Sequence, residues 1–252
     1  TGSDINGCLD TASISVQVDQ LPNVVASSAF NSICLGDSVL ISASGALNYQ
    51  WGNGVQISNQ YVSPTTIGNN SYIVTGSDIN SCSNSDTVNI LVNSLPMAQV
   101  SASDTNICIN DTITLLSSAA SNYQWNNGST SQSQTLILGN AGTTIFTVTI
   151  FDNNSCSATD SVIINVNNNP TISVSANNNN ICIGESVTLS ATGAINYLWD
   201  NGVTSSTQVI TPSTSAILTY SVVGTDINSC SANAQVNITV NPLPNTGPIF
   251  HN

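Results

Sequence analysis

The sequence predicts an all-β protein built from tandem antiparallel β-sandwiches, with a repeat of about 74 residues. Three observations predict it: residues recur at a fixed step, short β-branched runs alternate with turn residues, and no stretch has helical periodicity. The same step separates each tryptophan of the chain from the next, and it recurs in sets of tyrosines, cysteines and prolines: Trp51, Trp125, Trp199; Tyr49, Tyr123, Tyr197; Cys34, Cys108, Cys182; Cys8, Cys82, Cys156, Cys230; Pro22, Pro96, Pro170, Pro244.

The phase of the repeat sets the expected domain boundaries. Residues 1–22 align with residues 75–96, so we expect the first segment to be the C-terminal part of a truncated repeat and the parent protein to continue in both directions. The expected segments are 1–22, the three complete repeats 23–96, 97–170 and 171–244, and 245–252 as the start of a further segment. The sequence shows no signal peptide and no apolar run long enough to span a membrane.

The charge balance of the chain excludes several classes of partner. The 252 residues contain no Lys or Arg, and 13 acidic residues give a formal net charge of −13. Nucleic acids and anionic lipids depend on Lys and Arg for their affinity, so neither is an expected partner. Without these side chains, Lys and Arg salt bridges cannot stabilise the fold.

The strands expected in the first complete repeat follow from short β-branched or aromatic runs. By analogy with an immunoglobulin-type sandwich, about seven strands fit into one repeat. We expect strand A at 24–28, B at 39–44, C at 47–51, F at 72–77 and G at 87–92, with C′, D and E between residues 55 and 64.

Each repeat carries a Tyr-x-Trp sequence on the expected strand C, followed by an Asn-Gly turn. Residues two apart on a strand share a face, so the tyrosine and the tryptophan point the same way. We interpret both rings as core; the alternative is an exposed aromatic platform that stacks on sugar rings. The expected core residues are Tyr49, Trp51, Tyr123, Trp125, Tyr197 and Trp199, with Tyr72, Phe146 and Tyr220 as their packing partners.

Several of these motifs together resemble a known family. The string Ile33-Cys34-Leu35-Gly36-Asp37-Ser38-Val39, the Tyr-x-Trp sequence, the run from Tyr72 to Cys82 and the closing Leu95-Pro96 are similar to the PKD-like and Ig-like repeats of giant cell-surface adhesins of gliding Bacteroidota. The resemblance implies Ig-like sandwiches, export by type IX secretion, and a role in a long surface adhesin or filament, including gliding motility. The Trp-x-Asn-Gly turn is shorter than the Trp-Asp-Phe-Gly-Asp-Gly of a typical PKD domain.

The seven cysteines indicate disulfides rather than a metal site, because no histidine accompanies them and no Cys-x-x-Cys occurs. The simplest pairing is within each repeat and leaves the partner of Cys8 outside the chain: Cys34–Cys82, Cys108–Cys156 and Cys182–Cys230. The expected strand order favours a second pairing, between neighbouring repeats: Cys34–Cys156 and Cys108–Cys230. Free or intermolecular thiols are the third alternative.

An Asp-x-Asn sequence recurs in the expected F–G turn. Oxygen ligands two residues apart begin many calcium sites, so a calcium site is one interpretation. The other is an Asx-turn that closes the hairpin. The candidate ligands are Asp78, Asn80, Asp152, Asn154, Asp226 and Asn228. No other cofactor is expected.

A second recurring tripeptide is Asp, then Ser or Thr, then an apolar residue. It is similar to the O-glycosylation motif of exported Bacteroidota proteins, although the start of a strand favours the same residues. The candidate glycan acceptors are Thr11, Ser38, Thr87, Thr112 and Ser161. The third repeat has Glu185 and Ala234 at the corresponding acidic positions, so we expect no glycan there.

Catalysis finds no support, since the single histidine is His251 and no pattern of nucleophile and base recurs. Two functions remain: a non-catalytic stalk of an extracellular adhesin, whose partners are the adjoining repeats and lateral copies in a filament, or a module that binds polysaccharide. Tyr61 is the clearest exposed aromatic for the second function, but the other repeats lack an equivalent.

Overall fold

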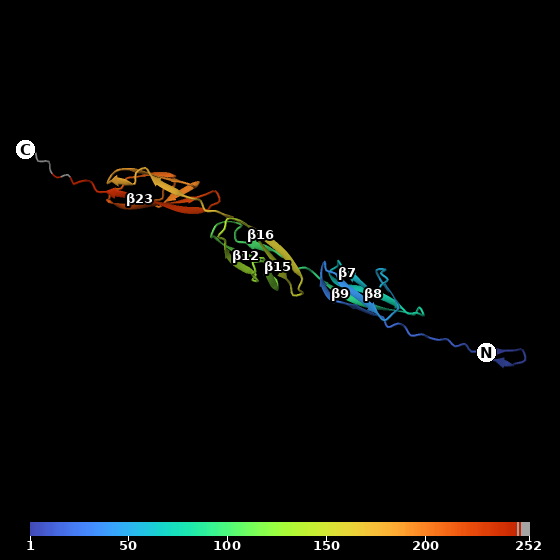
Figure 1. The fold of residues 1–252 in the computed structure, drawn as a ribbon. Helices are drawn as coiled ribbons and strands as arrows, with labels where there is room; N and C mark the ends of the chain where they lie inside the picture. The colour runs from blue at the N-terminus through green and yellow to red at the C-terminus, as the bar shows by residue number, and fades with distance from the viewer. Residues whose placement is uncertain (246, 248–252) are drawn as a thin grey trace, which may run out of the picture. The chain divides into compact units, whose positions relative to one another are not determined.

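The computed structural model describes residues 1–245 and residue 247. In this part of the chain there is no helix that is long and apolar enough to cross a membrane. The segment 1–22 contains one antiparallel pair, β1 (Gly2–Ser3) and β2 (Leu9–Asp10). Each of the three complete repeats then forms seven strands in two sheets (Figure 1).

The first complete repeat is a sandwich of a three-stranded and a four-stranded sheet. The three-stranded sheet has the order β3-β5-β7 and the four-stranded sheet the order β4-β9-β8-β6. All pairs are antiparallel except β4 with β9, which run parallel. The strands are β3 (Val25–Ser28), β4 (Ser32–Cys34), β5 (Val39–Ser44), β6 (Asn48–Trp51), β7 (Asn59–Val62), β8 (Gly68–Ser77) and β9 (Ser83–Asn93).

The second repeat has the same topology, with sheets β10-β12-β14 and β11-β16-β15-β13. Its strands are β10 (Val100–Ala102), β11 (Asn106–Cys108), β12 (Thr112–Ser117), β13 (Asn122–Trp125), β14 (Ser133–Ile137), β15 (Gly142–Phe151) and β16 (Ser157–Asn167).

The third repeat forms sheets β17-β19-β21 and β18-β23-β22-β20. Its strands are β17 (Ser173–Ala176), β18 (Asn180–Cys182), β19 (Val187–Thr192), β20 (Asn196–Trp199), β21 (Thr207–Ile210), β22 (Ala216–Thr225) and β23 (Ser231–Asn241). The chain therefore contains three tandem immunoglobulin-like β-sandwich domains, as the sequence predicts.

Alternating side chains build a separate core in each sandwich. In the first repeat, every second residue of β5 is buried, from Val39 through Ile41 to Ala43. These residues pack with Trp51 and with alternating residues of β8 and β9. The third repeat buries an equivalent cluster around Trp199. Period-two alternation with one face inward is what two packed sheets require.

Three of the predicted strands agree closely with the structure and the others need correction. Strand B has the predicted bounds, and strands A and C differ by one residue at their starts. The F and G strands, β8 and β9, are four residues longer at their N-terminal ends than predicted, and β9 also extends one residue further at its C-terminal end. The region between residues 55 and 64 forms one strand, β7, rather than three. Strand β4 was not predicted, and its parallel pairing with β9 corrects the expectation of wholly antiparallel sheets.

The turn after strand C is one residue longer than a two-residue Asn-Gly hairpin. The Gly54 N–H donates to the Trp51 carbonyl at 2.8 Å, and the Trp51 N–H donates to the Val55 carbonyl at 2.8 Å. Gly54 has a φ of 87°, while Asn53 does not have a positive φ. Only the glycine therefore needs the left-handed conformation, as in a turn closed by a glycine bulge.

Candidate functional site: the cysteine junctions

Two disulfides join neighbouring repeats. Cys34 of the first repeat is bonded to Cys156 of the second, and Cys108 of the second is bonded to Cys230 of the third. In both bonds the Cα atoms are 5.5 Å apart and the cysteines are separated by 122 residues. Pairing within repeats is therefore wrong, and the alternative that followed from the strand order is the one the structure contains.

The sandwich topology explains why cysteines of one repeat do not pair. Cys34 ends β4 beside Asn93, the last residue of β9, at the end of the sandwich where the chain leaves the repeat. Cys82 lies in the turn between β8 and β9, at the other end of those strands. Ten residues of extended β8 span about 33 Å, whereas a disulfide requires Cα atoms within about 7 Å.

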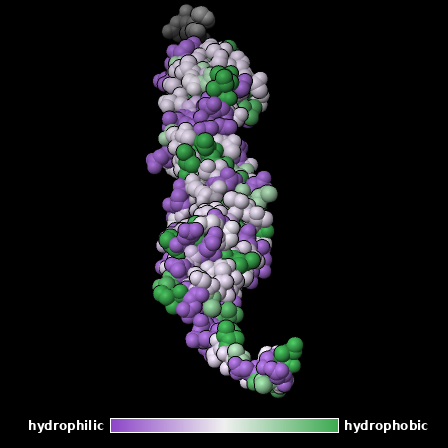
Figure 2. Space-filling model, turned by 90° about the vertical axis from the view of Figure 1, so that its right-hand side faces the viewer, coloured by the Kyte–Doolittle hydropathy of each residue, from purple (hydrophilic) through white to green (hydrophobic). Residues whose placement is uncertain are grey.

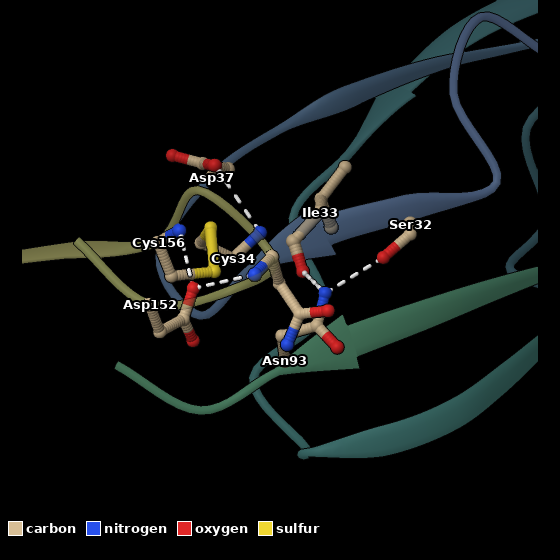
Figure 3. Close-up of a disulfide and its surroundings, with 8 residues drawn as sticks. Ser32, Ile33, Cys34, Asp37, Asn93, Asp152 and Cys156 are labelled. Carbon is tan, nitrogen blue, oxygen red and sulfur yellow. Dashed lines mark hydrogen bonds between the residues drawn. A yellow bond between two sulfur atoms is a disulfide. The ribbon is translucent and has the colours of Figure 1, made fainter. Parts of the chain in front are cut away.

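The turn that carries Cys34 is held by a carboxylate and by the neighbouring strand. The Cys34 N–H donates to Oδ2 of Asp37 at 3.3 Å, and the Asp37 N–H donates back to the Cys34 carbonyl at 3.0 Å. The Leu35 N–H donates to the Asn93 carbonyl at 2.9 Å, and the Asn93 amide donates to Oγ of Ser32 and to the Ile33 carbonyl. Figure 3 shows the hydrogen bond between Cys34 and Asp37 and those of the Asn93 amide with Ser32 and Ile33, beside the disulfide.

The turn that carries Cys156 is closed by Asp152. Its Oδ1 atom accepts hydrogen bonds from the N–H groups of Asn154 at 2.8 Å and of Cys156 at 2.9 Å (Figure 3). The backbone also closes the hairpin, because the Asp152 N–H donates to the Cys156 carbonyl at 3.0 Å. Ser155 takes a positive φ of 64° in this turn. This geometry is the Asx-turn that the Asp-x-Asn sequence indicates.

The other calcium candidates form the same turn. Oδ1 of Asp78 and Oδ1 of Asp226 each accept two backbone N–H groups at 2.9 Å. The partners of Asp78 are Asn80 and Cys82, and those of Asp226 are Asn228 and Cys230. Among residues 1–245 and 247, no three His, Cys, Asp or Glu side chains gather in a way that could hold a metal ion. One oxygen of each candidate carboxylate is thus already committed to the backbone.

Within residues 1–245 and 247, three cysteines are unpaired: Cys8, Cys82 and Cys182. The prediction that Cys82 and Cys182 form disulfides inside this chain is therefore corrected, since their within-repeat partners are bonded elsewhere. Partial desolvation, Asp78 and Asp19 raise the pKa of the Cys82 thiol above its ordinary value. A raised thiol pKa lowers the fraction of reactive thiolate at neutral pH.

The Tyr-x-Trp residues lie in or against the cores. Trp51, Trp125 and Trp199 are 2%, 2% and 1% exposed. Each indole N–H donates to a backbone carbonyl, and the three acceptors are those of Ile57, Ser131 and Ser205, at 2.8 to 2.9 Å. Rings that are this buried cannot stack on a sugar.

The tyrosines of the same sequence hold the turn that precedes strand C. Tyr49 Oη accepts the Ala46 N–H at 2.9 Å and donates to the Ala46 carbonyl at 2.9 Å. Tyr123 bonds Ala120 and Tyr197 bonds Ala194 in the same way. Tyr61, on β7, is 73% exposed and Phe30 is 68% exposed, so a ligand could reach both of these aromatic side chains of the first repeat.

All five candidate glycan acceptors, Thr11, Ser38, Thr87, Thr112 and Ser161, are exposed. The acidic residue that precedes each of two acceptors also has a structural contact that the sequence did not reveal. Asp86 accepts the Ala26 N–H at 2.7 Å, and Asp160 accepts the Val100 N–H at 2.8 Å, so each ties strand G to strand A. Hydrogen bonds from Ala26 and Thr87 lower the pKa of the Asp86 carboxyl.

Hydrophobic side chains are scattered over the outer surface rather than gathered into one large patch on the face shown (Figure 2). His251, the single histidine of the sequence, lies outside the described residues. The same disulfide junction between neighbouring repeats thus occurs twice, at cysteines that recur in the sequence with the 74-residue step. They are sites of covalent linkage.

No family model and no curated protein matches this chain. Solved structures with similar folds include three immunoglobulin domains of titin, I67–I69 in an E-to-A variant, at 11% identity over 90% of this chain and 100% of that one, with a TM-score of 0.38. A Ca2+-stabilized adhesin with which an Antarctic bacterium binds ice is 12% identical over 91% of this chain and 76% of that one, with a TM-score of 0.39. Immunoglobulin domains 1–5 of Sidekick-1 are 13% identical over 86% and 59%, with a TM-score of 0.28. At these values the likeness concerns the fold alone.

Proposed function

We propose that the chain is a non-catalytic structural segment of a long, exported cell-surface adhesin or filament. The observation that carries this proposal is that both junctions between complete repeats are closed by a disulfide from one sandwich to the next. A string of sandwiches whose neighbours are bonded to one another resists separation of the repeats more strongly than a string held by peptide linkers alone.

The disulfides also support an extracellular location, because such bonds persist in oxidising compartments and are rare in the cytosol. The resemblance to PKD-like repeats of gliding Bacteroidota supports export by type IX secretion and a part in surface attachment or gliding. With the tryptophans buried, the exposed aromatic side chains among the described residues are Phe30 and Tyr61, both in the first repeat, so the polysaccharide-binding alternative has no exposed aromatic that recurs from repeat to repeat. The stalk role is therefore the better supported of the two.

The disulfides change the path that carries tension. Between the chain ends, the shortest covalent path runs to Cys34, crosses to Cys156, returns along the chain to Cys108, and crosses to Cys230. Force therefore reaches the second sandwich through Cys156 and Cys108 rather than through its own ends. Residues 35–107 and 157–229 lie outside the loaded path.

Single-molecule pulling on the oxidised chain tests this proposal. We expect unequal unfolding steps, the largest releasing the segment 108–156, about 49 residues or about 170 Å of stretched chain. After reduction, each of the three repeats should release about 74 residues, or about 260 Å. Three unfolding steps of equal length in the oxidised chain would show that the disulfides do not carry force between neighbouring repeats.

A binding experiment provides the second arm of the test. The oxidised chain and a Tyr61→Ala variant are each incubated with insoluble polysaccharides and sedimented. A stalk segment should stay in the supernatant in both cases. Sedimentation of the wild-type chain that the Tyr61→Ala variant loses would replace the stalk proposal with the polysaccharide-binding function.

A further inference from the structure

Each complete repeat carries one Asn-Gly dipeptide, in the turn that follows strand C. The three dipeptides are Asn53-Gly54, Asn127-Gly128 and Asn201-Gly202. All three asparagines are exposed, and the glycines have φ values between 86° and 88°. Asparagine is chemically labile, and most so before glycine, because no side chain shields the glycine nitrogen from the asparagine amide. The chain therefore holds three recurring sites of spontaneous deamidation.

Deamidation of such a dipeptide begins with attack by its own backbone. The glycine nitrogen loses its proton and bonds to Cγ of the asparagine, the Cγ–Nδ2 bond breaks, and Nδ2 leaves as ammonia with a proton. The succinimide that forms takes up one water molecule and opens to aspartate or isoaspartate. The asparagine side chain must turn until Cγ faces the glycine nitrogen. A contact that holds this side chain in another orientation therefore slows the reaction.

A glutamine on the edge strand of the three-stranded sheet holds each of these asparagine side chains. In the first repeat, Asn53 Nδ2 donates to Oε1 of Gln60 on β7 at 2.7 Å, and Asn53 Oδ1 accepts the Val55 N–H at 3.3 Å. Gln60 Nε2 also donates to this Oδ1, at 3.4 Å. In the second and third repeats the bonds to the glutamine measure 2.8 and 2.6 Å, and the accepted bonds 3.2 and 3.3 Å: Asn127 with Gln134 and Ser129, and Asn201 with Gln208 and Val203.

The backbone fixes which way both amides point. An N–H can only donate, so the asparagine turns Oδ1 toward the N–H two residues on and Nδ2 toward the glutamine, which must then present Oε1. In the second and third repeats this arrangement leaves the Nε2 atoms of Gln134 and Gln208 buried without a hydrogen-bond partner among the described residues. A buried donor without an acceptor costs free energy. The asparagine therefore orients the glutamine, and the pair acts as one unit.

We propose that the three Asn-Gly dipeptides are latent deamidation sites and that Gln60, Gln134 and Gln208 are positioning residues that keep them unreacted. Loss of this protection would add one negative charge per site to a chain with a net charge of −13 and no Lys or Arg. Isoaspartate would also lengthen the backbone within the turn. This inference goes beyond the stalk role and does not rest on it, because it depends only on contacts inside each repeat.

Burial of the glutamine sets the expected order of protection. Gln208 is 8% exposed, whereas Gln60 and Gln134 are half-buried. A hydrogen bond removed from water is stronger than one in contact with it. Asn201 should therefore react more slowly than Asn53 and Asn127.

The test follows all three sites in one chain during incubation at mildly alkaline pH. The folded, oxidised chain is compared with the reduced chain in denaturant, where the glutamines hold nothing. Digestion before aspartate releases Asn53 in fragment 37–77, and conversion to aspartate splits this fragment before residue 53. Tandem mass spectrometry measures aspartate and isoaspartate together. We expect each site to react at least about tenfold more slowly in the folded chain, as the loss of one hydrogen bond or more would give.

Variants of the first repeat separate the hydrogen bond from the general rigidity of the sandwich. Gln60→Leu removes the acceptor, and we expect the rate at Asn53 to rise about fivefold while the rates at Asn127 and Asn201 of the same chain stay unchanged. Gln60→Glu retains an acceptor oxygen and should keep Asn53 protected. Val62→Ala removes packing from the same strand but leaves the pair intact, so the rate at Asn53 should stay close to that of wild type.

Gln134→Leu repeats the measurement at Asn127, so the test does not depend on the folding of a single variant. A rate at the paired asparagine that does not rise in either leucine variant would overturn the proposal. So would a rise at Asn53 in Val62→Ala as large as in Gln60→Leu, because loosening of the repeat would then explain both. Equal rates in the folded and the denatured wild-type chain would contradict any protection.

Discussion

Cys34 and Cys156 are bonded although 122 residues separate them, and each stands in a turn that its own repeat holds in place. Asp37 fixes the first turn and Asp152 fixes the second. The junction is thus assembled from two local structures, each specified by a short sequence. The disulfide joins halves that the separate sandwiches present.

Replacing either cysteine of this pair should remove the same stabilisation. On the chain-entropy model, closing a loop of 122 residues contributes about 5 kcal/mol, an upper value that strain reduces. We expect Cys34→Ser and Cys156→Ser to lower the melting temperature equally, and the double variant to lower it no further, as measured by calorimetry. Cys8→Ser serves as the control and should leave the melting temperature unchanged. If the double variant lost the sum of the two single losses, the two cysteines would not act as a pair.

The stability of the Asx-turn at Asp152 should depend on the acceptor oxygen of this side chain and not on its negative charge. Asp152→Ala leaves two backbone N–H groups without their partner, and we expect a loss of about 1 to 2 kcal/mol in the free energy of unfolding. Asp152→Asn retains the acceptor and should stay close to wild type. Denaturant unfolding of the two variants measures both. A calcium site at this turn would instead make Asp152→Asn as damaging as Asp152→Ala and would make stability sensitive to a chelator.

Asp86 should make the stability of the first repeat depend on acidic pH. Its folded-state pKa is lowered by hydrogen bonds from the Ala26 and Thr87 N–H groups, so the unfolded chain binds the proton at a higher pH than the folded one. The contribution is present above the ordinary aspartate pKa and is lost as pH falls through the folded pKa. Melting curves of wild type and Asp86→Asn from neutral pH downward should converge in acid. A difference between them that does not change with pH would contradict this origin.

The buried indole of Trp199 should stabilise the third repeat and should not contribute to polysaccharide binding. Trp199→Phe removes an N–H that donates to the Ser205 carbonyl at 2.9 Å and leaves space in a filled core. We expect a loss of about 2 to 4 kcal/mol in the unfolding free energy of the third repeat. Denaturation of this variant and of Trp51→Phe, which has the matching bond to Ile57, monitored by circular dichroism because each variant lacks the tryptophan of its own repeat, measures the effect in two repeats. A stable variant with altered polysaccharide retention would place the indole at a surface instead.

Much of the fold could be predicted because the repeat fixes the phase of its core residues. The step between Trp51, Trp125 and Trp199 identifies three equivalent cores, and alternation in residues 39–44 gives strand B its bounds. Strand β4 escaped prediction because three residues, Ser32-Ile33-Cys34, show no period. Its partner strand lies far along the chain, at Leu91 to Asn93, and runs parallel to it.

The candidate site was predictable only in part for the same reason. The Asp-x-Asn sequence identifies the Asx-turn, since that geometry is local. Which cysteines meet depends on which ends of the sandwich carry the turns, and separation along the chain favoured Cys34–Cys82 over the bond that forms. The contact of Asp86 with Ala26 joins two strands 60 residues apart, and no pattern in the sequence connects them.

Peptide mapping without reduction is the most direct measurement of the two disulfides between neighbouring repeats. A protease that cleaves before aspartate places every cysteine in its own fragment, in a chain that trypsin cannot cut. We expect two linked pairs, fragment 19–36 with fragment 152–159, and fragment 104–110 with fragment 226–252. Fragment 19–36 linked to fragment 78–85 would show pairing within a repeat and would contradict the junctions described above.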